Sequence, residues 1–456
     1  MRRISIDAFG MNHPKETAFA ATRRRRTPWY LSRPRLLTTC VFFAVLYLWL
    51  KLGDTTVPIP EDSYALVEDE SLKDILNTTL GFQKILVLNL PYRTDRRDSM
   101  ALAAATSNIK LDYVDGVTGE SINQKAYPPP DENIKLREGI KGSWRTHMNA
   151  MQRVVEQNLT TALIFEDDVD WDVRVRANLQ RFALASRFLS ENKESLSSKY
   201  KIENVPNTET SETMFHMLSP NGITDYLPSM PLSSIGTKGR HYPKHKHHDS
   251  PYGDPTKWDI LWIGHCGAGF PRHPPTSSSK SPLTTSNLIL THSNDATVPI
   301  SKYLKSHPFQ DALDPLAPAY PPHTRIYHHA TGGTLCTVGY AVSQRGARRL
   351  LHQFGLKHWN NIYDAEMGRW CASEDEKEDK EGKEYRGMER VCLTTQPPIF
   401  AHHHPLNGES DIGGLGGGYA RKYETKYLRY SVRMNLERLV QGSRDGGGLV
   451  DQWPDD

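Results

Sequence analysis

The sequence predicts an α/β fold with a mostly parallel sheet, long disordered insertions and one N-terminal transmembrane helix. Short apolar runs that are too brief for helices alternate with segments whose apolar residues recur at helical spacing. This alternation is typical of strand–helix–strand units in a parallel sheet. An uncharged apolar run near the N-terminus predicts the membrane segment, and stretches rich in Ser, Pro and Thr predict the insertions.

The N-terminal apolar run extends from Leu36 to Leu50 and is followed by Lys51 and Leu52. With the snorkelling stem of Lys51 it reaches the lower limit for a membrane span, about 17 residues. Arginines at 23–26, 33 and 35 precede the run and acidic residues follow it, so the positive-inside rule predicts a lumenal C-terminal body. A short span suits the thin membranes of the early secretory pathway. The chain is therefore expected to be a single-pass type II protein of the Golgi or the endoplasmic reticulum.

A cleaved signal peptide is the alternative for this run, but it would need a small-residue cleavage site. The residues Leu48-Trp-Leu-Lys-Leu offer no such site, and residues 1–35 already precede the run. We therefore expect a basic cytoplasmic tail at 1–35, a transmembrane anchor at 36–52 and a polar lumenal stem at 53–80. Asn77 in this stem opens a usable glycosylation sequon, whereas Asn158 directly precedes a buried strand and is not expected to be modified.

The folded domain is expected over residues 81–440. It begins with the strand Lys84–Leu90, an apolar run bounded by Gly81 and Pro91. The next elements are a helix through Ser99–Thr106, a strand at Leu111–Asp115, a helix at Trp144–Gln157 and a buried strand at Thr161–Phe165. The C-terminal half adds strands at Trp258–Gly264 and Thr334–Ser343 and helices at Gln344–Phe354 and Arg421–Val440.

Four further segments are predicted to lack regular structure. The two insertions, at about 191–257 and 270–325, are rich in Ser, Pro and Thr. The alternating charges of Glu374–Glu384 predict a solvated loop. Residues 441–456 are expected to form a disordered tail.

Charge excludes one class of partner, because 56 basic and 53 acidic residues leave a formal net charge of only +3. Such a chain has no strong global field, so no nucleic-acid partner is expected. Cys40 lies in the apolar run, and the other four cysteines allow three pairings. Cys371 with Cys392 is the first choice because the two bracket a charged loop, and Cys266 with Cys336 would follow. Four unpaired core cysteines are the alternative.

The acidic triplet Glu166, Asp167 and Asp168 directly follows the buried strand Thr161–Phe165. Three consecutive carboxylates at a buried strand end repel one another and lose solvation, and a divalent cation offsets both costs. Hard Mg²⁺ or Mn²⁺ takes carboxylate and phosphate oxygens, and ligands bind at the ends of parallel strands. The triplet therefore indicates a metal site; an acidic cluster favoured by a helix N-terminus is the alternative.

Several motifs occur in an order that resembles one family of enzymes. They are Leu88-Asn-Leu-Pro-Tyr-Arg-Thr-Asp-Arg-Arg, Gly142-Ser-Trp-Arg-Thr-His-Met-Asn-Ala, Ala162-Leu-Ile-Phe-Glu-Asp-Asp-Val, Trp258-Asp-Ile-Leu-Trp-Ile-Gly, Gly339-Tyr-Ala-Val-Ser and Ser410-Asp-Ile. This series resembles glycosyltransferase family 25, the lipopolysaccharide and collagen-type galactosyltransferase group. The likeness is strongest over residues 84–187 and patchy from 258 to 412.

The resemblance implies a GT-A-like nucleotide-sugar-binding fold, with residues 81–440 as its catalytic domain. It implies metal-dependent, inverting transfer, commonly of galactose from UDP-galactose, to a glycan or glycoprotein acceptor. Glu166, Asp167 and Asp168 then correspond to the metal-binding acidic motif of that fold, with Mn²⁺ or Mg²⁺ as cofactor and a UDP-sugar as donor. The family helix usually opens with a Ser-His pair, whereas Ser143 and His147 are separated here, so that only His147 aligns.

Substrate-binding residues are expected beside the first strand. Leu88 and Asn89 would lie at the end of the first strand, beside the nucleotide. Arg93 and Arg97 would lie near its phosphate or base, because a planar guanidinium donates two hydrogen bonds to phosphate. His147 is expected to contact the donor. The alternatives are solvent-facing helix charges for the arginines and a satisfied core position for the histidine.

An inverting transfer needs a general base that deprotonates the acceptor hydroxyl. The candidates for this catalytic role are Asp364, Glu366 and Asp411, with surface turns as the alternative for each. Two histidine clusters are of the residue type that binds zinc. The first is His245, His247 and His248, and the second is His402 to His404. Roles as structural or cleft-lining residues are favoured over zinc, because zinc needs convergent ligands with a fixed second shell.

Two other classes of protein compete with the transferase. A catalytically inactive, membrane-anchored glycan-binding protein or scaffold is one, because a fold does not guarantee activity. A metal-dependent hydrolase is the other, and it would need more dispersed ligands. Metal-dependent binding of UDP distinguishes the transferase from both.

Overall fold

The computed structural model of the chain divides into two compact units, residues 1–55 and 56–456. It describes residues 39–44, 46–47, 69–191, 196, 199–210, 213–219, 222, 224–235, 250–272, 283–306, 312–374, 389–405, 410–412, 423–442 and 448–455. The predicted tail at 1–35 and most of the predicted anchor at 36–52 lie outside these residues. Within the described residues, no helix has the length and apolar character of a membrane span. The anchor therefore stays a prediction.

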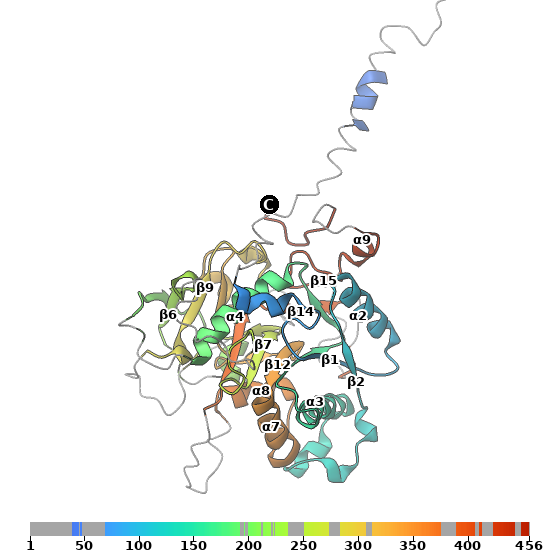
Figure 1. Ribbon diagram of the computed structural model, residues 1–456, viewed down its shortest axis with the longest axis vertical. Helices are drawn as coiled ribbons and strands as arrows, with labels where there is room; N and C mark the ends of the chain where they lie inside the picture. Colours follow the sequence, from blue (N-terminus) through green and yellow to red (C-terminus); the bar gives the residue numbers. More distant parts are fainter. Residues whose placement is uncertain are drawn as a thin grey trace, which may run out of the picture. The chain divides into compact units, whose positions relative to one another are not determined.

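The larger unit is built around one mixed sheet with helices on both faces (Figure 1). Within the described residues its strands run in the order β2 (Asp112–Asp115), β1 (Lys84–Asn89), β3 (Thr161–Glu166), β12 (Gly339–Ser343), β7 (Ile260–Gly264), β13 (Cys392–Gln396), β10 (Arg325–His329), β9 (Ile289–His292), β6 (Tyr226–Pro231) and β5 (Glu203–Pro206). Strands β4 (Val169–Trp171), β14 (Phe400–His404) and β15 (Glu424–Thr425) branch from this path, and β8 (Gly267–Ala268) pairs with β11 (Thr334–Leu335).

The predicted strands and helices of the N-terminal half are all present. Strands β2, β1 and β3 are parallel, as an α/β fold requires. The sequence did not predict that β12 would pair antiparallel with both β3 and β7, or that β10 would pair antiparallel with β13 and β9. These pairings join segments that are distant in sequence, so local periodicity carries no information about them.

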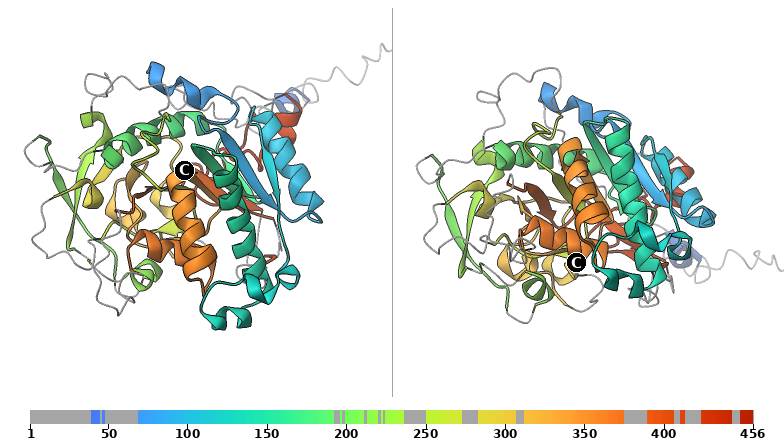
Figure 2. Two further views of the ribbon diagram at one scale, coloured as in Figure 1. Left: turned by 60° about the horizontal axis from the view of Figure 1, so that its bottom comes forward. Right: turned by 90° about the horizontal axis from the view of Figure 1, so that it is seen from below.

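Strand β1 explains why the sheet lies between two helical layers. Successive side chains of a strand point to opposite faces. Ile85 and Val87 belong to one buried cluster, and Leu86 and Leu88 belong to another. The first cluster includes side chains of α2 (Thr94–Thr106) and α4 (Val175–Glu191); the second includes those of α3 (Glu138–Glu156), α7 (Gln344–His352) and α8 (Tyr363–Cys371). Helices α3 and α7 lie side by side on their face (Figure 2).

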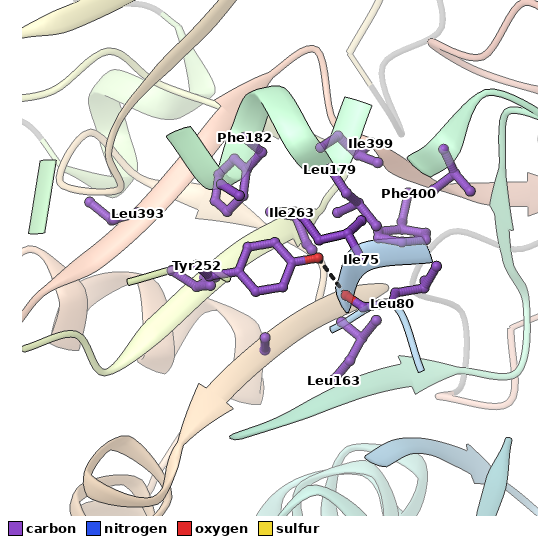
Figure 3. Close-up of a cluster of buried hydrophobic side chains, with 14 of the residues drawn as sticks. Ile75, Leu80, Leu163, Leu179, Phe182, Tyr252, Ile263, Leu393, Ile399 and Phe400 are labelled. Carbon is purple, nitrogen blue, oxygen red and sulfur yellow. Dashed lines mark hydrogen bonds between the residues drawn. The ribbon is translucent and has the colours of Figure 1, made fainter. Parts of the chain in front are cut away.

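Residues 70–80 were predicted as stem, but they belong to the folded core. The 3-10 helix Glu70–Leu76 buries Leu72 and Ile75 completely. Nearby, the Tyr252 hydroxyl donates a hydrogen bond of 2.7 Å to the Leu80 carbonyl oxygen (Figure 3). The folded body therefore begins before the expected boundary at residue 81.

The described parts of the two predicted insertions are folded as well. Strands β5, β6 and β9 extend the sheet, and the short helices α5 (Met214–Leu218) and α6 (Leu316–Ala319) lie in the same segments. Leu227, Ile289 and Val298 are buried in one cluster that these segments share with β10. Each of these strands is short and gains its partner from a distant segment, which is why local composition alone indicated disorder. Residues 236–249 and 273–282, within the insertions, lie outside the described part.

The C-terminal segment also differs from prediction. The helix expected at Arg421–Val440 is reduced to α9 (Leu436–Val440). Ahead of α9, the Ser431 hydroxyl donates to the buried Asp170, and the Arg433 guanidinium donates to the carbonyl oxygens of Asp167 and Val169 at 2.7 and 2.8 Å. These tertiary bonds outweigh the helix propensity of the segment. In the predicted disordered tail, Leu449 and Trp453 are buried.

Both favoured disulfides are confirmed. Cys266 is bonded to Cys336 and Cys371 to Cys392, while Cys40 is free. The strand expected at Thr334–Ser343 is interrupted at Cys336, whose backbone is left-handed at φ 64°. Of the charged loop at Glu374–Glu384, only Glu374 is described.

Both glycosylation sequons are exposed. Asn77 follows the first 3-10 helix and Asn158 follows the end of α3, and both side chains face solvent. Exposure therefore does not distinguish the two sites, and the expectation that Asn77 is modified and Asn158 is not stays a prediction.

Ile75→Ala is expected to lower the free energy of unfolding by about 2–5 kcal/mol, because it removes a fully buried side chain from the core. Leu76 is a matched control, since it is the next residue and is 37% exposed. Leu76→Ala should change the free energy by about 0.5 kcal/mol or less. Urea unfolding of the two variants measures the difference, and equal effects would contradict the inclusion of residues 70–80 in the core.

Candidate active site

A cavity of about 630 Å³ lies at the carboxyl ends of β1 and β3. These two strands are parallel, and Leu88 is paired with Glu166 in their register. The next residues along the two strands, Asn89 and Asp167, therefore leave the sheet side by side at its carboxyl edge. This is the edge at which α/β proteins bind their ligands. All three carboxylates of the predicted triplet line the cavity, together with Leu88 and Asn89.

Asp167 and Asp168 share one cation. Arg96 donates hydrogen bonds through Nη1 to Asp167 Oδ1 at 2.7 Å and to Asp168 Oδ2 at 2.9 Å. Asn89 Nδ2 donates to the other oxygen of Asp167 at 2.8 Å. Burial and the charge of Asp168 raise the pKa of Asp167 despite these bonds. Burial also acts to raise the pKa of Asp168, but the charges of His402 and Arg96 outweigh it and hold that pKa well below the usual range.

Glu166 has different partners from the two aspartates. The Thr337 hydroxyl donates to Glu166 Oε1 at 2.6 Å, and His147 Nε2 lies 3.6 Å from the same oxygen. His147 Nδ1 is 2.9 Å from the Tyr340 hydroxyl, and the imidazole stacks on the Tyr363 ring with centroids 4.6 Å apart. His147 is thus a buried histidine with partners on both nitrogens, and it also lines the cavity.

The second histidine cluster lines the cavity, as expected. Strand β14 pairs antiparallel with β4, which brings His402 next to the triplet, with Nε2 2.9 Å from Asp168 Oδ2. Burial lowers the pKa of His402, but Asp168 and Glu166 together raise it above its ordinary value. Burial instead lowers the pKa of His403 to about 3 and that of His404 to about 2. The electrostatic environment therefore favours the charged form at His402 alone of the three. The other cluster, His245 to His248, lies outside the described residues.

The structure places a different arginine in the cavity from the two that the sequence indicated. Arg93 pairs with Asp95 at 2.7 Å and with Asp411, and the Arg97 guanidinium lies over the Tyr113 ring, 4.2 Å from its centroid. Neither lines the cavity, whereas Arg96 does. Helical spacing does not distinguish the two neighbours, because Arg96 and Arg97 both precede buried residues of α2 at helical intervals.

The three candidate bases occupy different environments. Asp364 lines the cavity and accepts hydrogen bonds from the backbone amides of Cys336 and Ala365, each at 2.7 Å; burial raises its pKa. Asp411 also lines the cavity, but it is ion-paired with Arg93 and lies 3.6 Å from Arg96. Glu366 is not in the cavity. It pairs with Arg369 in a separate cavity of about 240 Å³, because residues two apart face opposite sides of a helix.

The side chains around the triplet have the chemistry that a hard divalent ion needs. Asp168 Oδ1 and Asn89 Oδ1 are buried and accept no hydrogen bond within the described part of the chain. With the nitrogen of His402 in its neutral form, which metal binding requires, these oxygens form the kind of donor set that Mn²⁺ accepts. The described residues nevertheless contain no group of three or more His, Cys, Asp or Glu side chains already arranged around a metal position. The donors are present, but Arg96 occupies two of the carboxylate oxygens.

An α/β sheet with an acidic triplet and a cavity at the carboxyl edge of its parallel strands fits the GT-A-like class of nucleotide-sugar-dependent glycosyltransferases. Residues 82–238 match the family model described as glycosyltransferase family 25 (LPS biosynthesis protein). This match confirms the resemblance drawn from the motifs, over the segment that the family model covers.

The curated relatives are similar over a limited segment. Procollagen galactosyltransferase 1-A of Xenopus laevis is 28% identical over 112 residues, which is 22% of this chain and 18% of the relative. Procollagen galactosyltransferase 2 of Homo sapiens is 26% identical over 113 residues, again 22% and 18%. The human protein named inactive glycosyltransferase 25 family member 3 is 30% identical over 113 residues, 22% of this chain and 19% of that protein. The chain thus matches less than a fifth of the length of these relatives.

Proposed function

We propose that this chain is a metal-dependent glycosyltransferase that transfers galactose from UDP-galactose, with inversion, to a glycan or glycoprotein acceptor. The observation that carries the proposal is the meeting of Asn89, Asp167, Asp168 and Arg96 in one cavity at the carboxyl edge of the sheet. The family and the names of the two procollagen galactosyltransferases support the choice of a nucleotide sugar and of galactose.

The residues around the triplet would bind the nucleotide-sugar donor. Asp167, Asp168 and His402 would hold Mn²⁺ or Mg²⁺, with Asn89 as a neutral oxygen donor. The ion would supply charge stabilisation for the departing diphosphate. Arg96 lines the cavity and would donate hydrogen bonds to the same diphosphate. These bonds would strengthen as negative charge develops on the leaving oxygen.

Asp364 is the proposed general base. It lies in the cavity apart from the arginines that neutralise Asp411, and burial raises its pKa, which improves a carboxylate as a proton acceptor. The backbone amides of Cys336 and Ala365 fix the orientation of its carboxylate. In the transfer, Asp364 would take the proton of the acceptor hydroxyl as that oxygen attacks the anomeric carbon of the sugar.

A second candidate function has its own support. One relative carries the name of an inactive family member, so a protein that binds glycans without transferring sugar is the alternative. Turnover of the donor separates it from the proposed enzyme.

We also propose that residues 36–52 anchor the chain in a Golgi or endoplasmic-reticulum membrane with the catalytic domain in the lumen. In the described part of this run, Val41, Phe42 and Phe43 are each more than half exposed, which is costly for apolar side chains in water. The full-length chain should remain in the membrane pellet after alkaline carbonate extraction. Changing these three residues to lysine should release it, and a pellet that is equally resistant in both proteins would contradict the anchor.

Titration of the full-length chain in detergent is expected to show UDP binding that depends on Mn²⁺. Asp168→Ala should weaken that binding at least about tenfold, a loss of about 1.4 kcal/mol, because it removes the carboxylate with a free buried oxygen. Glu366→Gln, a carboxylate change outside the cavity, is the control and should bind UDP as the wild type does. Calorimetry measures all three proteins, and unaltered UDP affinity in Asp168→Ala would remove the basis for the metal assignment.

Asp364→Asn is expected to lower kcat by about 10²–10⁴-fold while UDP affinity stays unchanged, because the variant keeps the shape of the base and loses its proton affinity. Glu366→Gln, two residues further along α8, should retain the wild-type kcat. Hydrolysis of UDP-galactose, or transfer to an acceptor once one is found, provides the rate. A normal rate in Asp364→Asn would shift the role to Asp411.

A further inference from the structure

We propose that Arg96 is an exchangeable internal cation. It holds the acidic triplet while no metal is bound, and it leaves the triplet for the donor diphosphate when a divalent ion takes its place. This inference rests on the proposed function, because it assigns a step to the same donor site.

The position of Arg96 shows that it competes with a metal. One nitrogen, Nη1, donates to Asp167 Oδ1 and to Asp168 Oδ2 at 2.7 and 2.9 Å. The side chains of these three residues are at most 19% exposed, so the charges are poorly screened and require compensation. Asp167 and Asp168 would also hold a divalent ion, and Arg96 now occupies one oxygen of each. Arg96 and the ion would therefore compete for these carboxylates.

Two unused oxygens lie beside the arginine. Asp168 Oδ1 and Asn89 Oδ1 are buried without a hydrogen-bond donor among the described residues. Asn89 is only 2% exposed, and both residues line the cavity. Arg96 therefore binds one oxygen of Asp167 and one of Asp168, while the second oxygen of Asp168 and the amide oxygen of Asn89 have no hydrogen-bond donor in the part of the chain that the structure describes. In a permanent buried ion pair the carboxylate and amide oxygens usually all have hydrogen-bond donors. The two oxygens without donors therefore favour the interpretation that Arg96 occupies the place of a metal ion.

Asp411 is a carboxylate with which Arg96 can pair after a metal ion has displaced it from the triplet. Its side chain already lines the cavity, and its second nitrogen, Nη2, lies 3.6 Å from Oδ2 of Asp411, a carboxylate outside the triplet. A rotation of this long side chain toward Asp411 would keep its charge paired while it frees the planar fork for phosphate oxygens. The neighbouring Arg97 has no comparable route, because it lies over the Tyr113 ring outside the cavity.

The exchange predicts opposite changes in two affinities of one variant. Arg96→Ala in the full-length chain should bind Mn²⁺ at least about fivefold more tightly than the wild type, because the competing cation is gone. At saturating Mn²⁺ the same variant should bind UDP at least about tenfold more weakly, because it lacks the phosphate ligand. Arg97→Ala is the matched control and should stay within about twofold for both ligands. Electron paramagnetic resonance of free Mn²⁺ gives the first affinity, and calorimetry gives the second.

Several outcomes would overturn the inference. If Arg96 is only structural, its removal should weaken both affinities, and a Mn²⁺ affinity that falls or stays the same excludes the exchange. Arg96→Gln provides the same comparison if the alanine variant is unstable, because glutamine keeps polar contacts but carries no charge. If the wild type binds neither Mn²⁺ nor UDP, the proposed function fails and the exchange fails with it. If the wild type binds both and only the opposite changes are missing, the exchange alone is wrong.

Discussion

The structure depends on the parallel pairing of β1 with β3 and on the register of that pair. Because Leu88 lies opposite Glu166, both chains leave the sheet at the same level, and Asn89 meets Asp167. A shift of one residue would turn the buried side chains of β1 toward the wrong helical layer. The hydrophobic alternation of Ile85 to Leu88 between two cores therefore fixes the position of the acidic triplet as well as the stability of the sheet.

The charge at this edge then determines how distant segments fold. A cluster of carboxylates at a buried strand end is tolerated only where cations and donors face it. Arg96 comes from α2, His402 from β14, and Arg433 from the segment before α9. The same requirement explains why residues before α9 are not helical, since Ser431 satisfies the buried Asp170. Side chains from segments that are far apart in the sequence thus meet at this edge, and Arg96 and His402 line the cavity.

Sequence reasoning recovered what local pattern determines. The apolar runs of β1 and β3, the triplet that follows β3 and both disulfides were predicted from residue type and spacing. It chose Arg93 and Arg97 over Arg96, since three charges in one helical turn look alike until the buried face of α2 is known. The folded state of β6 and β9 could not be inferred, because each strand depends on a partner far along the chain. Asp364 and Glu366 were equivalent in sequence and are separated only by the direction of α8.

Only part of the cavity is formed by the segment that is similar to known proteins, and this limits what those relatives can indicate about the substrates. Asn89, Arg96 and the triplet lie within residues 82–238, so most of the proposed donor site belongs to the segment that matches the family model. Thr337 and Asp364 lie beyond that segment, and so does His402, which contacts the triplet from the unmatched part of the chain. An enzyme that retains its donor chemistry can change its acceptor by changing the opposite wall, since specificity resides in contacts made by the acceptor in the transition state. The proposed donor can therefore be inferred from the family, whereas the acceptor must be sought from the Asp364 side of the cavity and not from the name procollagen.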